Sequence, residues 1–475
     1  MPAFDVVVLG CGPAGERAAI HAARAHKRVA VVERASAVGG NRVNWGTIPS
    51  KTLRESALHI LTLRRGQLHG IRTEFKAELT VADFMYRERV VVQRELELIN
   101  ESLDRDQIEV LKGHARFLDP HTVAITGVDG QVRTQLSGEV MIIATGSRPH
   151  HPADLVFDGQ IVFDSESILA LPRMPRSMIV LGAGVIGIEY ASIFAALGLQ
   201  VTLVDTRELL LPYCDREIVV LLERELRRMG VVIVHADRHT KVERHGEQAR
   251  VTTQAGNVLE ADVVLSCVGR DGNTLDLGLE TLGIAPNKYG LLEVNENLQT
   301  RHPNVYAVGD VIGYPSLAST AMEQGRQAIR HAFRIPGVAL KTEVLPYAVY
   351  AIPELSYVGA TEEALAAAGT PYVVGRGRYD QNPRGLIIGD TGGLLKLLFE
   401  KGSMRLLGVH IIGTNASELV HIGFAFLRSN ATAVQIAETL FNYPTLSDLY
   451  RHAALKALGE QQKQQAGPPP PMSAP

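Results

Sequence analysis

Hydrophobic and polar positions along the chain predict an alternation of strands and helices. Short, wholly apolar runs such as VVVL (6–9) and MIVL (178–181) predict strands that are buried on both faces of a parallel sheet. Each of these runs is followed by a segment in which apolar residues recur every three or four positions, which is the period of an amphipathic helix. This alternation predicts an α/β fold.

The first strand, helix and second strand (4–33) form a complete βαβ unit with a glycine-rich turn. Gly10 permits a tight turn, Gly12 lets the backbone approach a pyrophosphate, and Gly15 lets the helix pack close to the strand. The phosphates are expected at the helix N-terminus, where N–H groups and the helix dipole favour anions. Glu33 ends the second strand and can accept hydrogen bonds from a ribose; a glutamate at this place is common where the ligand is FAD.

The same pattern recurs over residues 177–208, where a turn of three glycines is followed by the strand VTLVD. Asp205 and Arg207 stand at the end of that strand, where an acid can accept from a 2′-hydroxyl and an arginine can bind a 2′-phosphate. This combination predicts an NAD(P) site that accepts both nucleotides. Its turn residues are Gly182, Gly184 and Gly187.

Three further segments complete the predicted sites. VMIIATGSRP (140–149) and LSCVGRDGNT (265–274) are buried strands that end in small-residue turns, where the chain crosses between domains. Asp310 follows a third strand and precedes a helix, so it can hold a hydroxyl of the FAD sugar chain. From the two crossing segments we expect Thr145 and Gly146 to bind FAD, and Gly269 and Arg270 to bind NAD(P).

From about residue 344 the pattern changes to strands such as GGLLKLLFE (392–400) and helices such as ASELVHIGFAFLRS (416–429), without a glycine fingerprint. This pattern predicts an α+β dimerisation domain. The expected domains are an FAD-binding domain over 1–150 and 275–343, an NAD(P)-binding domain over 151–274, the dimerisation domain over 344–459, and a disordered, proline-rich tail over 460–475.

Composition excludes several classes of protein. Apolar residues make up 46% and charged residues 21% of the 475 residues, with a net charge of −3, so no nucleic acid or other polyanion is expected as a partner. The sequence has no apolar run near the ~20 residues that a membrane helix needs and no basic-then-apolar leader, so we expect a cytoplasmic protein. Cys11, Cys214 and Cys267 are few and far apart, which argues against a disulfide framework and predicts no metal site.

The order of these motifs, with VGGNRVNWGTIPSK (38–51) after the first fingerprint, is similar to that of the flavoprotein family of dihydrolipoamide dehydrogenase, glutathione reductase and mercuric reductase. The resemblance covers the chain apart from its tail. Within the family, NWGTIPSKTLRE, GVIGIEYASIF and FNYPTLSDLYRHAALKAL look most like the soluble pyridine nucleotide transhydrogenases. The resemblance implies a homodimer, possibly a higher oligomer, that binds FAD and moves a hydride equivalent between NADPH and NAD⁺.

The resemblance also shows what this sequence lacks. The family's disulfide reductases carry two cysteines at the positions of Arg42 and Thr47, and a histidine and a glutamate at the positions of Tyr443 and Asp448. The dithiol and its base are therefore missing together, which fits an enzyme that does not reduce disulfides. Arg42 is expected near the pyrophosphate or the flavin.

The flavin-holding part of the signature is retained in Gly39, Gly40 and Lys51. By resemblance, Lys51 lies beside the flavin ring and pairs with Glu189 from the second fingerprint helix, where a fixed ammonium would stabilise negative charge on the ring. The sequence predicts a ping-pong cycle in which NADPH delivers a hydride, NADP⁺ leaves and NAD⁺ enters the same site.

Two other functions stay open from the sequence alone. The first is an NAD(P)H dehydrogenase that passes electrons to a quinone, a dye or oxygen. The second, of another class, is a catalytically silent relative that survives as a binding subunit. Reduction of a nicotinamide analogue by NADPH distinguishes the transhydrogenase from the first, and uptake of FAD distinguishes it from the second.

Overall fold

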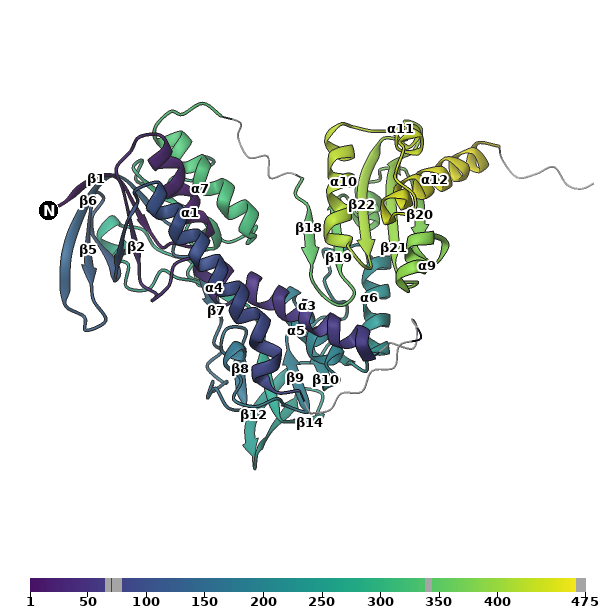
Figure 1. The fold of residues 1–475 in the computed structure, drawn as a ribbon, viewed down its shortest axis with the longest axis horizontal. Helices are drawn as coiled ribbons and strands as arrows, with labels where there is room; N and C mark the ends of the chain where they lie inside the picture. Colours follow the sequence, from purple (N-terminus) through teal and green to yellow (C-terminus); the bar gives the residue numbers. More distant parts are fainter. Residues whose placement is uncertain (65–69, 71–78, 338–343, 467–475) are drawn as a thin grey trace, which may run out of the picture. The chain divides into compact units, whose positions relative to one another are not determined.

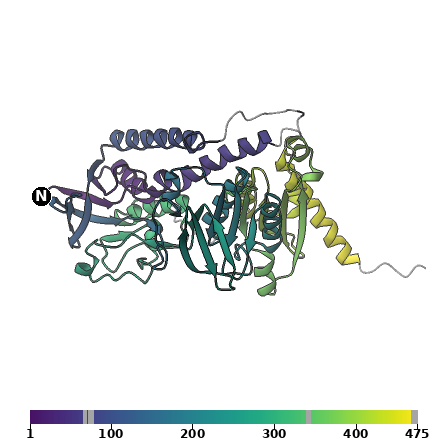
Figure 2. The same ribbon diagram turned by 90° about the horizontal axis from the view of Figure 1, so that it is seen from below.

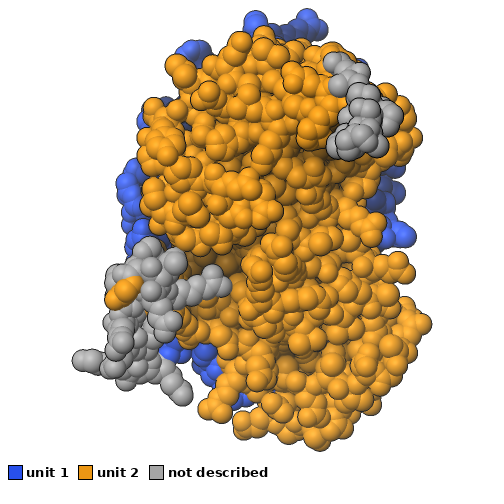
Figure 3. Space-filling view, turned by 90° about the vertical axis from the view of Figure 1, so that its right-hand side faces the viewer, with its two compact units in different colours: residues 1–53, 79–174, 265–341 blue, residues 54–78, 175–264, 342–475 orange. Residues whose placement is uncertain are grey.

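The computed structural model describes residues 1–64, 70, 79–337 and 344–466. The chain divides into two compact units, coloured in Figure 3. Unit 1 comprises Met1–Leu53, Leu79–Met174 and Leu265–Lys341, and unit 2 comprises Arg54–Glu78, Pro175–Val264 and Thr342–Pro475. Each unit contains one of the two glycine-rich turns.

A seven-stranded sheet forms the centre of unit 1 (Figure 1). Its order is β3-β2-β1-β6-β5-β4, and β17 pairs with β6. The pairs of β1 with β2 and β6, of β2 with β3 and of β6 with β17 are parallel, whereas β4, β5 and β6 are antiparallel neighbours. The strands are β1 (Ala3–Leu9), β2 (Val29–Glu33), β3 (Glu109–Lys112), β4 (His114–Asp119), β5 (Thr122–Thr126), β6 (Val132–Ile143) and β17 (Val305–Ala307).

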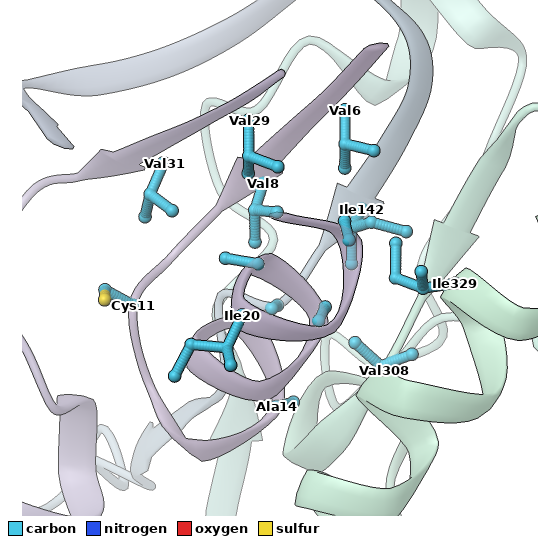
Figure 4. Packing of buried hydrophobic residues seen from close by; sticks show 14 of the residues in the cluster. Val6, Val8, Cys11, Ala14, Ile20, Val29, Val31, Ile142, Val308 and Ile329 are labelled. Atoms are coloured by element: carbon cyan, nitrogen blue, oxygen red, sulfur yellow. The ribbon is translucent and has the colours of Figure 1, made fainter. Parts of the chain in front are cut away.

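Two helices, α1 (Pro13–Arg24) and α7 (Ala318–Ala332), pack closely on each other in unit 1 (Figures 1 and 4). The contact is close because small residues line it: a Cβ added at Gly325 would lie 2.2 Å from the backbone oxygen of Ala14. Val6 and Val8 of β1 are fully buried in the core that contains these helices. A larger side chain at position 325 would therefore force the two helices apart.

The remaining elements of unit 1 are short or lie outside the main sheet. β7 and β16 form a two-stranded antiparallel sheet, in which Arg270 pairs with Pro149. The helix α3 begins in unit 1 and ends in unit 2. These elements are α2 (Gly40–Asn44), α3 (Thr47–Arg64), α4 (Val81–Arg105), β7 (Ser147–Pro149), β8 (Val162–Asp164), η2 (Ser167–Ala170), β16 (Arg270–Gly272), η3 (Leu279–Leu282) and η4 (Gly309–Ile312).

Unit 2 begins with four strands of a second, five-stranded sheet in the order β11-β10-β9-β15, of which β11, β10 and β9 are parallel neighbours. The small antiparallel sheet β12-β13-β14 follows. The helix α5 connects β9 to β10, as the predicted βαβ unit requires. The elements are β9 (Ser177–Leu181), α5 (Val185–Ala196), β10 (Gln200–Val204), α6 (Arg216–Arg228), β11 (Val232–Val234), β12 (His239–His245), β13 (Gln248–Thr253), β14 (Val258–Ala261) and β15 (Val263–Ser266).

The C-terminal part of unit 2 is a five-stranded antiparallel sheet in the order β18-β19-β22-β21-β20. The strand that the sequence predicts within 392–400 is present as β21, and the helix that it predicts at 416–429 is present as α10. The elements are β18 (Tyr347–Val349), β19 (Leu355–Gly359), α8 (Glu362–Ala367), β20 (Tyr372–Arg378), η5 (Tyr379–Gln381), α9 (Pro383–Ile388), β21 (Leu394–Glu400), β22 (Leu406–Ile412), α10 (Ala416–Arg428), α11 (Ala433–Glu438), η6 (Leu446–Asp448) and α12 (Leu449–Ala466).

The last helix extends further than the sequence suggests. We expected a disordered tail from residue 460, but α12 continues without interruption to Ala466 (Figure 2). Residues 460–463 are glutamate, glutamine and lysine, which favour helices, and Lys463 donates a hydrogen bond to Glu460 at 2.8 Å. The prediction for 460–466 is therefore wrong, and the rest of the predicted tail lies outside the described residues.

A buried lysine connects the C-terminal sheet of unit 2 to the start of α6. Lys396, in the middle of β21, has a side chain with no solvent exposure. Its ammonium lies 2.8 Å from Asp215, which is equally buried, and 3.0 Å from Glu217. It also contacts Glu362. Burial opposes the charged form of Lys396, but the hydrogen bonds to Asp215 and Glu362 outweigh it and raise its pKa.

Replacing this lysine is expected to destabilise unit 2. Lys396→Met leaves the Asp215 carboxylate buried without its partner, which typically costs about 3–5 kcal/mol of unfolding free energy. Arg376→Met is the matched control, because its ion pair with Glu217 is 43% exposed on the arginine side, and such surface pairs contribute about 0–1 kcal/mol. Urea denaturation followed by circular dichroism measures the unfolding free energy of both variants. Equal losses in the two variants would contradict the stabilising role of the buried Lys396–Asp215 pair.

Candidate functional site

The first glycine-rich turn, in unit 1, has a backbone that only glycine allows. Gly10 has φ +99°, and a Cβ added to it would lie 2.5 Å from the backbone oxygen of Ala144. A Cβ on Gly15 would lie 1.9 Å from the oxygen of Gly10. Gly12 caps α1 without any side-chain hydrogen bond, so the amides at this helix N-terminus are available to an anion.

The acid at the end of β2 fastens this turn. Glu33 is buried, and its Oε2 accepts a hydrogen bond from the N–H of Cys11 at 2.8 Å while its Oε1 accepts from Ala35 at 2.8 Å. The signature segment joins the same turn, because Gly39 donates to the Cys11 oxygen and a Cβ on Gly40 would lie 2.6 Å from the Cα of Gly12. The structure thus brings Gly39 and Gly40 against the first fingerprint.

Arg42 forms a buried ion pair with Glu16 on the first turns of α1. Its Nη2 lies 3.0 Å from Glu16 Oε2, and the two side chains are 12% and 3% exposed. Arg17 approaches the other oxygen of Glu16 at 3.5 Å. The Nε of Arg42 is buried and has no hydrogen-bond partner among the described residues. The arginine at the place of a family cysteine therefore neutralises a carboxylate beside the predicted diphosphate site.

The cysteines of the chain offer no substitute for the missing dithiol. Cys11 and Cys214 are buried, and none of the three cysteines forms a disulfide. Burial, together with Glu33 and Glu16, raises the pKa of the Cys11 thiol to about 12, so it remains protonated at neutral pH. Burial likewise raises the pKa of Cys214 to about 12.

A second group of predicted residues meets around the two crossing strands of unit 1. Ser147 donates a hydrogen bond to Asp310 at 2.9 Å, and the Nε of Arg270 donates to the Ser147 hydroxyl at 2.9 Å. Arg270 also pairs with Glu166 at 3.2 Å. The Oγ1 of Thr145 is buried with no hydrogen-bond partner among the described residues, which marks it as a group that a ligand can satisfy.

The next residues place this group in the fold. A Cβ on Gly146 would meet no atom within 4 Å, so the turn is open there. Gly269 lies immediately before β16. Gly309, beside Asp310, donates its N–H to Gln324 of α7 at 2.8 Å. Arg270, which we predicted to bind NAD(P), thus lies in unit 1 beside Asp310, which we predicted to bind FAD.

The second glycine-rich turn, in unit 2, repeats the geometry of the first. Gly182 has φ +92°, and Gly184 caps α5 without a side-chain hydrogen bond. A Cβ on Gly184 would meet no atom within 4 Å, so space is open before the helix N-terminus, while Gly187 is buried in α5. Asp205 accepts a hydrogen bond from the N–H of Ala183 at 2.5 Å, as Glu33 does from Cys11.

Lys51 and Glu189 lie in different units. Lys51 lies in α3, where its Nζ donates to the Ser50 hydroxyl at 3.5 Å. Glu189 lies in α5, is 3% exposed and accepts a hydrogen bond from the backbone N–H of Tyr350 at 2.9 Å. Their pairing stays a prediction.

Comparison with known proteins identifies the family of the chain. Residues 4–325 match the family model described as pyridine nucleotide-disulphide oxidoreductase, and residues 345–454 match its dimerisation domain. The chain belongs to the pyridine nucleotide-disulphide oxidoreductase family. Membership confirms the predicted α/β fold with a C-terminal dimerisation domain, and it makes the protein an oxidoreductase of the flavoprotein class.

Several relatives are similar over nearly the whole chain. A protein named soluble pyridine nucleotide transhydrogenase from Mycobacterium bovis is 44% identical over 97% of this chain and 98% of its own. One of the same name from Escherichia coli is 40% identical over 96% and 98%. The structure of LpdA from Mycobacterium tuberculosis matches with TM-score 0.88 and 27% identity over 96% and 99% of the two chains.

The shared fold does not by itself decide the reaction. The HOCl-induced flavoprotein disulfide reductase RclA from Escherichia coli matches with TM-score 0.85 and 28% identity over 95% of this chain and 99% of its own. A protein named as a disulfide reductase and proteins named as transhydrogenases therefore share this architecture. The side chains at the reacting positions must distinguish them.

Sequence reasoning missed two partners in these sites. Glu16, which binds Arg42, follows the first fingerprint directly, and an acid on the first turns of a helix was the available signal. Ser147, which connects Asp310 to Arg270, follows the ATG turn.

Within the described residues, no helix is both long and apolar enough to cross a membrane.

The ion pair between Arg42 and Glu16 is expected to stabilise unit 1. Arg42→Met removes the closer cation from Glu16 and should lower the free energy of unfolding by about 1–3 kcal/mol, because a buried group loses its partner. In the double variant Glu16→Gln with Arg42→Met, much of the loss should be recovered. Thermal and urea unfolding of the two single variants and the double variant gives the coupling; strictly additive losses would contradict it.

Proposed function

We propose that this protein is an FAD-dependent transhydrogenase that moves a hydride equivalent between NADPH and NAD⁺ without a redox-active disulfide. One observation carries the proposal. Both dinucleotide-binding turns are complete, yet Arg42 and Thr47 occupy the positions of the dithiol, with Arg42 in a buried ion pair. Electrons that reach the cofactor have no disulfide to accept them, and a second nicotinamide is the acceptor that the family's nucleotide site already fits.

The relatives support the same activity. Relatives from Mycobacterium bovis, Colwellia psychrerythraea and Escherichia coli, 40% to 44% identical over almost their full lengths, are named soluble pyridine nucleotide transhydrogenase. Identity at this level over both units makes a shared reaction the simplest inference.

The residues of unit 1 fit FAD. The amides of α1 behind Gly12 suit its diphosphate, and Glu33 and Asp310 suit its sugar hydroxyls. The unsatisfied Thr145 hydroxyl and the open turn at Gly146 offer further contacts. When bound, FAD would supply the hydride chemistry, because a flavin can exchange a hydride with a nicotinamide.

Lys51 and Glu189 are proposed to position charge at the reacting ring. The backbone N–H of Tyr350 holds Glu189, so its carboxylate has a fixed orientation. In the proposed role, Glu189 orients the Lys51 ammonium, and that ammonium stabilises negative charge on the ring system. Arg42 contributes positive charge at the first turn, where its pair with Glu16 removes a carboxylate that would repel a diphosphate.

We propose that one nucleotide site serves both substrates in a ping-pong cycle. NADP⁺ leaves after transfer, and NAD⁺ enters the same turn at Gly182, Gly184 and Gly187. Arg270, the first residue of β16, and Gly269, which precedes it, remain candidates for contact with NAD(P). Such a cycle requires that the site bind both nucleotides without holding either too tightly.

A homodimer is proposed as the working form. The dimerisation-domain model covers 345–454, and two large apolar side chains in that range are strongly exposed: Leu440 at 90% and Tyr443 at 75%. Burial of such side chains against a second copy would remove them from water.

Asp448, at the position of the family glutamate, instead contacts His452 at 3.2 Å.

The reaction itself can be tested with purified, FAD-loaded protein. NADPH and a thio-analogue of NAD⁺ should give the reduced analogue, whereas NADPH with lipoamide or glutathione disulfide should give no turnover. Absorbance of the reduced analogue measures the transfer. No reduced analogue together with rapid quinone reduction would replace this proposal with an NAD(P)H dehydrogenase, and turnover of either disulfide would contradict the assignment of Arg42 and Thr47.

A spectral titration tests where the electrons reside. On addition of NADPH, the flavin absorbance should bleach without the long-wavelength band that arises when a thiolate lies against a flavin. The expectation follows from the absence of a thiol at positions 42 and 47 and from the pKa of about 12 of Cys11. Appearance of that band would show that a cysteine contacts the ring after all.

A further inference from the structure

The carboxylate of Asp205 is fully occupied by hydrogen bonds from the protein. It lies at the end of β10, is 3% exposed, and accepts from the backbone N–H groups of Ala183 at 2.5 Å and Arg207 at 2.8 Å. The Arg207 side chain adds a bidentate pair, with Nε at 2.8 Å and Nη2 at 2.7 Å. A carboxylate offers about four acceptor positions, so none is left for a ribose hydroxyl.

Within the residues that the structure describes, Glu33, the corresponding acid of unit 1, accepts hydrogen bonds from backbone donors only. Glu33 accepts backbone hydrogen bonds from Cys11 and Ala35, in the same pattern as Asp205 accepts from Ala183 and Arg207. Because the residue two positions after Glu33 is an alanine, no side chain there closes the carboxylate, and these are its only hydrogen bonds in the described part of the chain. The Arg207 side chain is therefore the feature that blocks Asp205.

We propose that Arg207 determines how one site accepts both nucleotides: it stays on Asp205 when NADP(H) binds and swings off Asp205 when NAD(H) binds. The inference rests on the proposed transhydrogenase function and concerns the nucleotide site of that same reaction. The Arg207 side chain is 39% exposed, so it can move into solvent while the two backbone donors remain in place. Its departure opens two acceptor positions for the ribose of NAD(H).

The 2′-phosphate of NADP(H) requires no such movement. The Nη1 of Arg207 makes no hydrogen bond within the described ranges, and the guanidinium is partly exposed, so it can bind a phosphate while it remains on Asp205. The negative charge of Asp205 offsets that of the guanidinium, which limits the affinity for the phosphate. A limited affinity suits a cycle in which NADP⁺ must leave before NAD⁺ can enter.

Asp205 and Arg207 form a charged pair in this structure. Burial would raise the pKa of Asp205, but the hydrogen bonds from Arg207 and Ala183 outweigh burial and hold that pKa below its usual value. The same pair raises the pKa of Arg207. Both groups are therefore charged at neutral pH, and NAD(H) must displace a charge-assisted bidentate contact to gain its own hydrogen bond.

The test uses two probes that differ only in the 2′-phosphate: adenosine 2′,5′-bisphosphate and adenosine 5′-monophosphate. Calorimetry with the FAD-loaded protein measures their affinities. In Arg207→Ala, the affinity for the bisphosphate should fall about tenfold or more, because a charge-assisted contact is lost. The affinity for the monophosphate should rise roughly two- to tenfold, because Asp205 no longer has to release a side chain.

Two further variants sharpen the result. Arg228→Ala removes the same charge from a 61% exposed side chain of α6 and should change both affinities less than about twofold. Asp205→Asn keeps an oxygen for the Ala183 N–H but weakens the hold on Arg207, so it should strengthen bisphosphate binding. Circular dichroism checks that each variant is folded.

The decisive result is that Arg207→Ala weakens binding of the bisphosphate and strengthens binding of the monophosphate. Weaker binding of both probes, or weaker bisphosphate binding with no gain for the monophosphate, would overturn the inference. Failure of the proposed function gives a different pattern: no hydride reaches the thio-analogue of NAD⁺, while the two probes still respond to Arg207→Ala with opposite signs.

Discussion

Both nucleotide turns depend on one interaction: an acid at the end of the second strand accepts a hydrogen bond from the backbone of the glycine loop. Glu33 binds the N–H of Cys11, and Asp205 binds the N–H of Ala183. Each bond holds the loop where the chain leaves the first strand and enters the helix. Because the loop then cannot tilt away, the amides of α1 and α5 point out from a fixed place, and a diphosphate can bind to backbone that is already oriented.

The rest of each unit maintains this arrangement. In unit 1 the glycine loop lies against Ala144 and Gly40, and α1 packs on α7 through glycine and alanine, so the helix N-terminus has little room to shift. In unit 2 the loop that follows Asp205 leads to Asp215, the N-cap of α6, and the Asp215 carboxylate pairs with the buried Lys396 of the C-terminal sheet. The nucleotide turn and the last sheet of unit 2 are thus connected through one short stretch of chain.

Local patterns predicted the strands, the glycine turns and the acids that follow them, because each depends on residues within about 30 positions of one another in a βαβ unit. The partners of Arg42, Asp310 and Lys396 could not be predicted in this way. They come from segments 26 to 181 residues apart, and no periodicity relates them. The proline-rich composition of 460–475 predicted a disordered tail, but the polar residues at its start favour a helix, and α12 continues to Ala466. The orientation of Arg207 was also beyond prediction, since an exposed arginine has many rotamers.

The ion pair between Arg42 and Glu16 has a consequence for electron storage. A flavin and a disulfide together can hold two pairs of electrons, whereas a flavin alone holds one pair. An ion pair holds none. With FAD bound, this protein would therefore have no reservoir: each pair of electrons must leave before the next can be accepted. Donor and acceptor would then be consumed in strict alternation, and the ratio of the two nicotinamide pools in the surroundings, rather than any thiol reserve in the protein, would set the direction of flow.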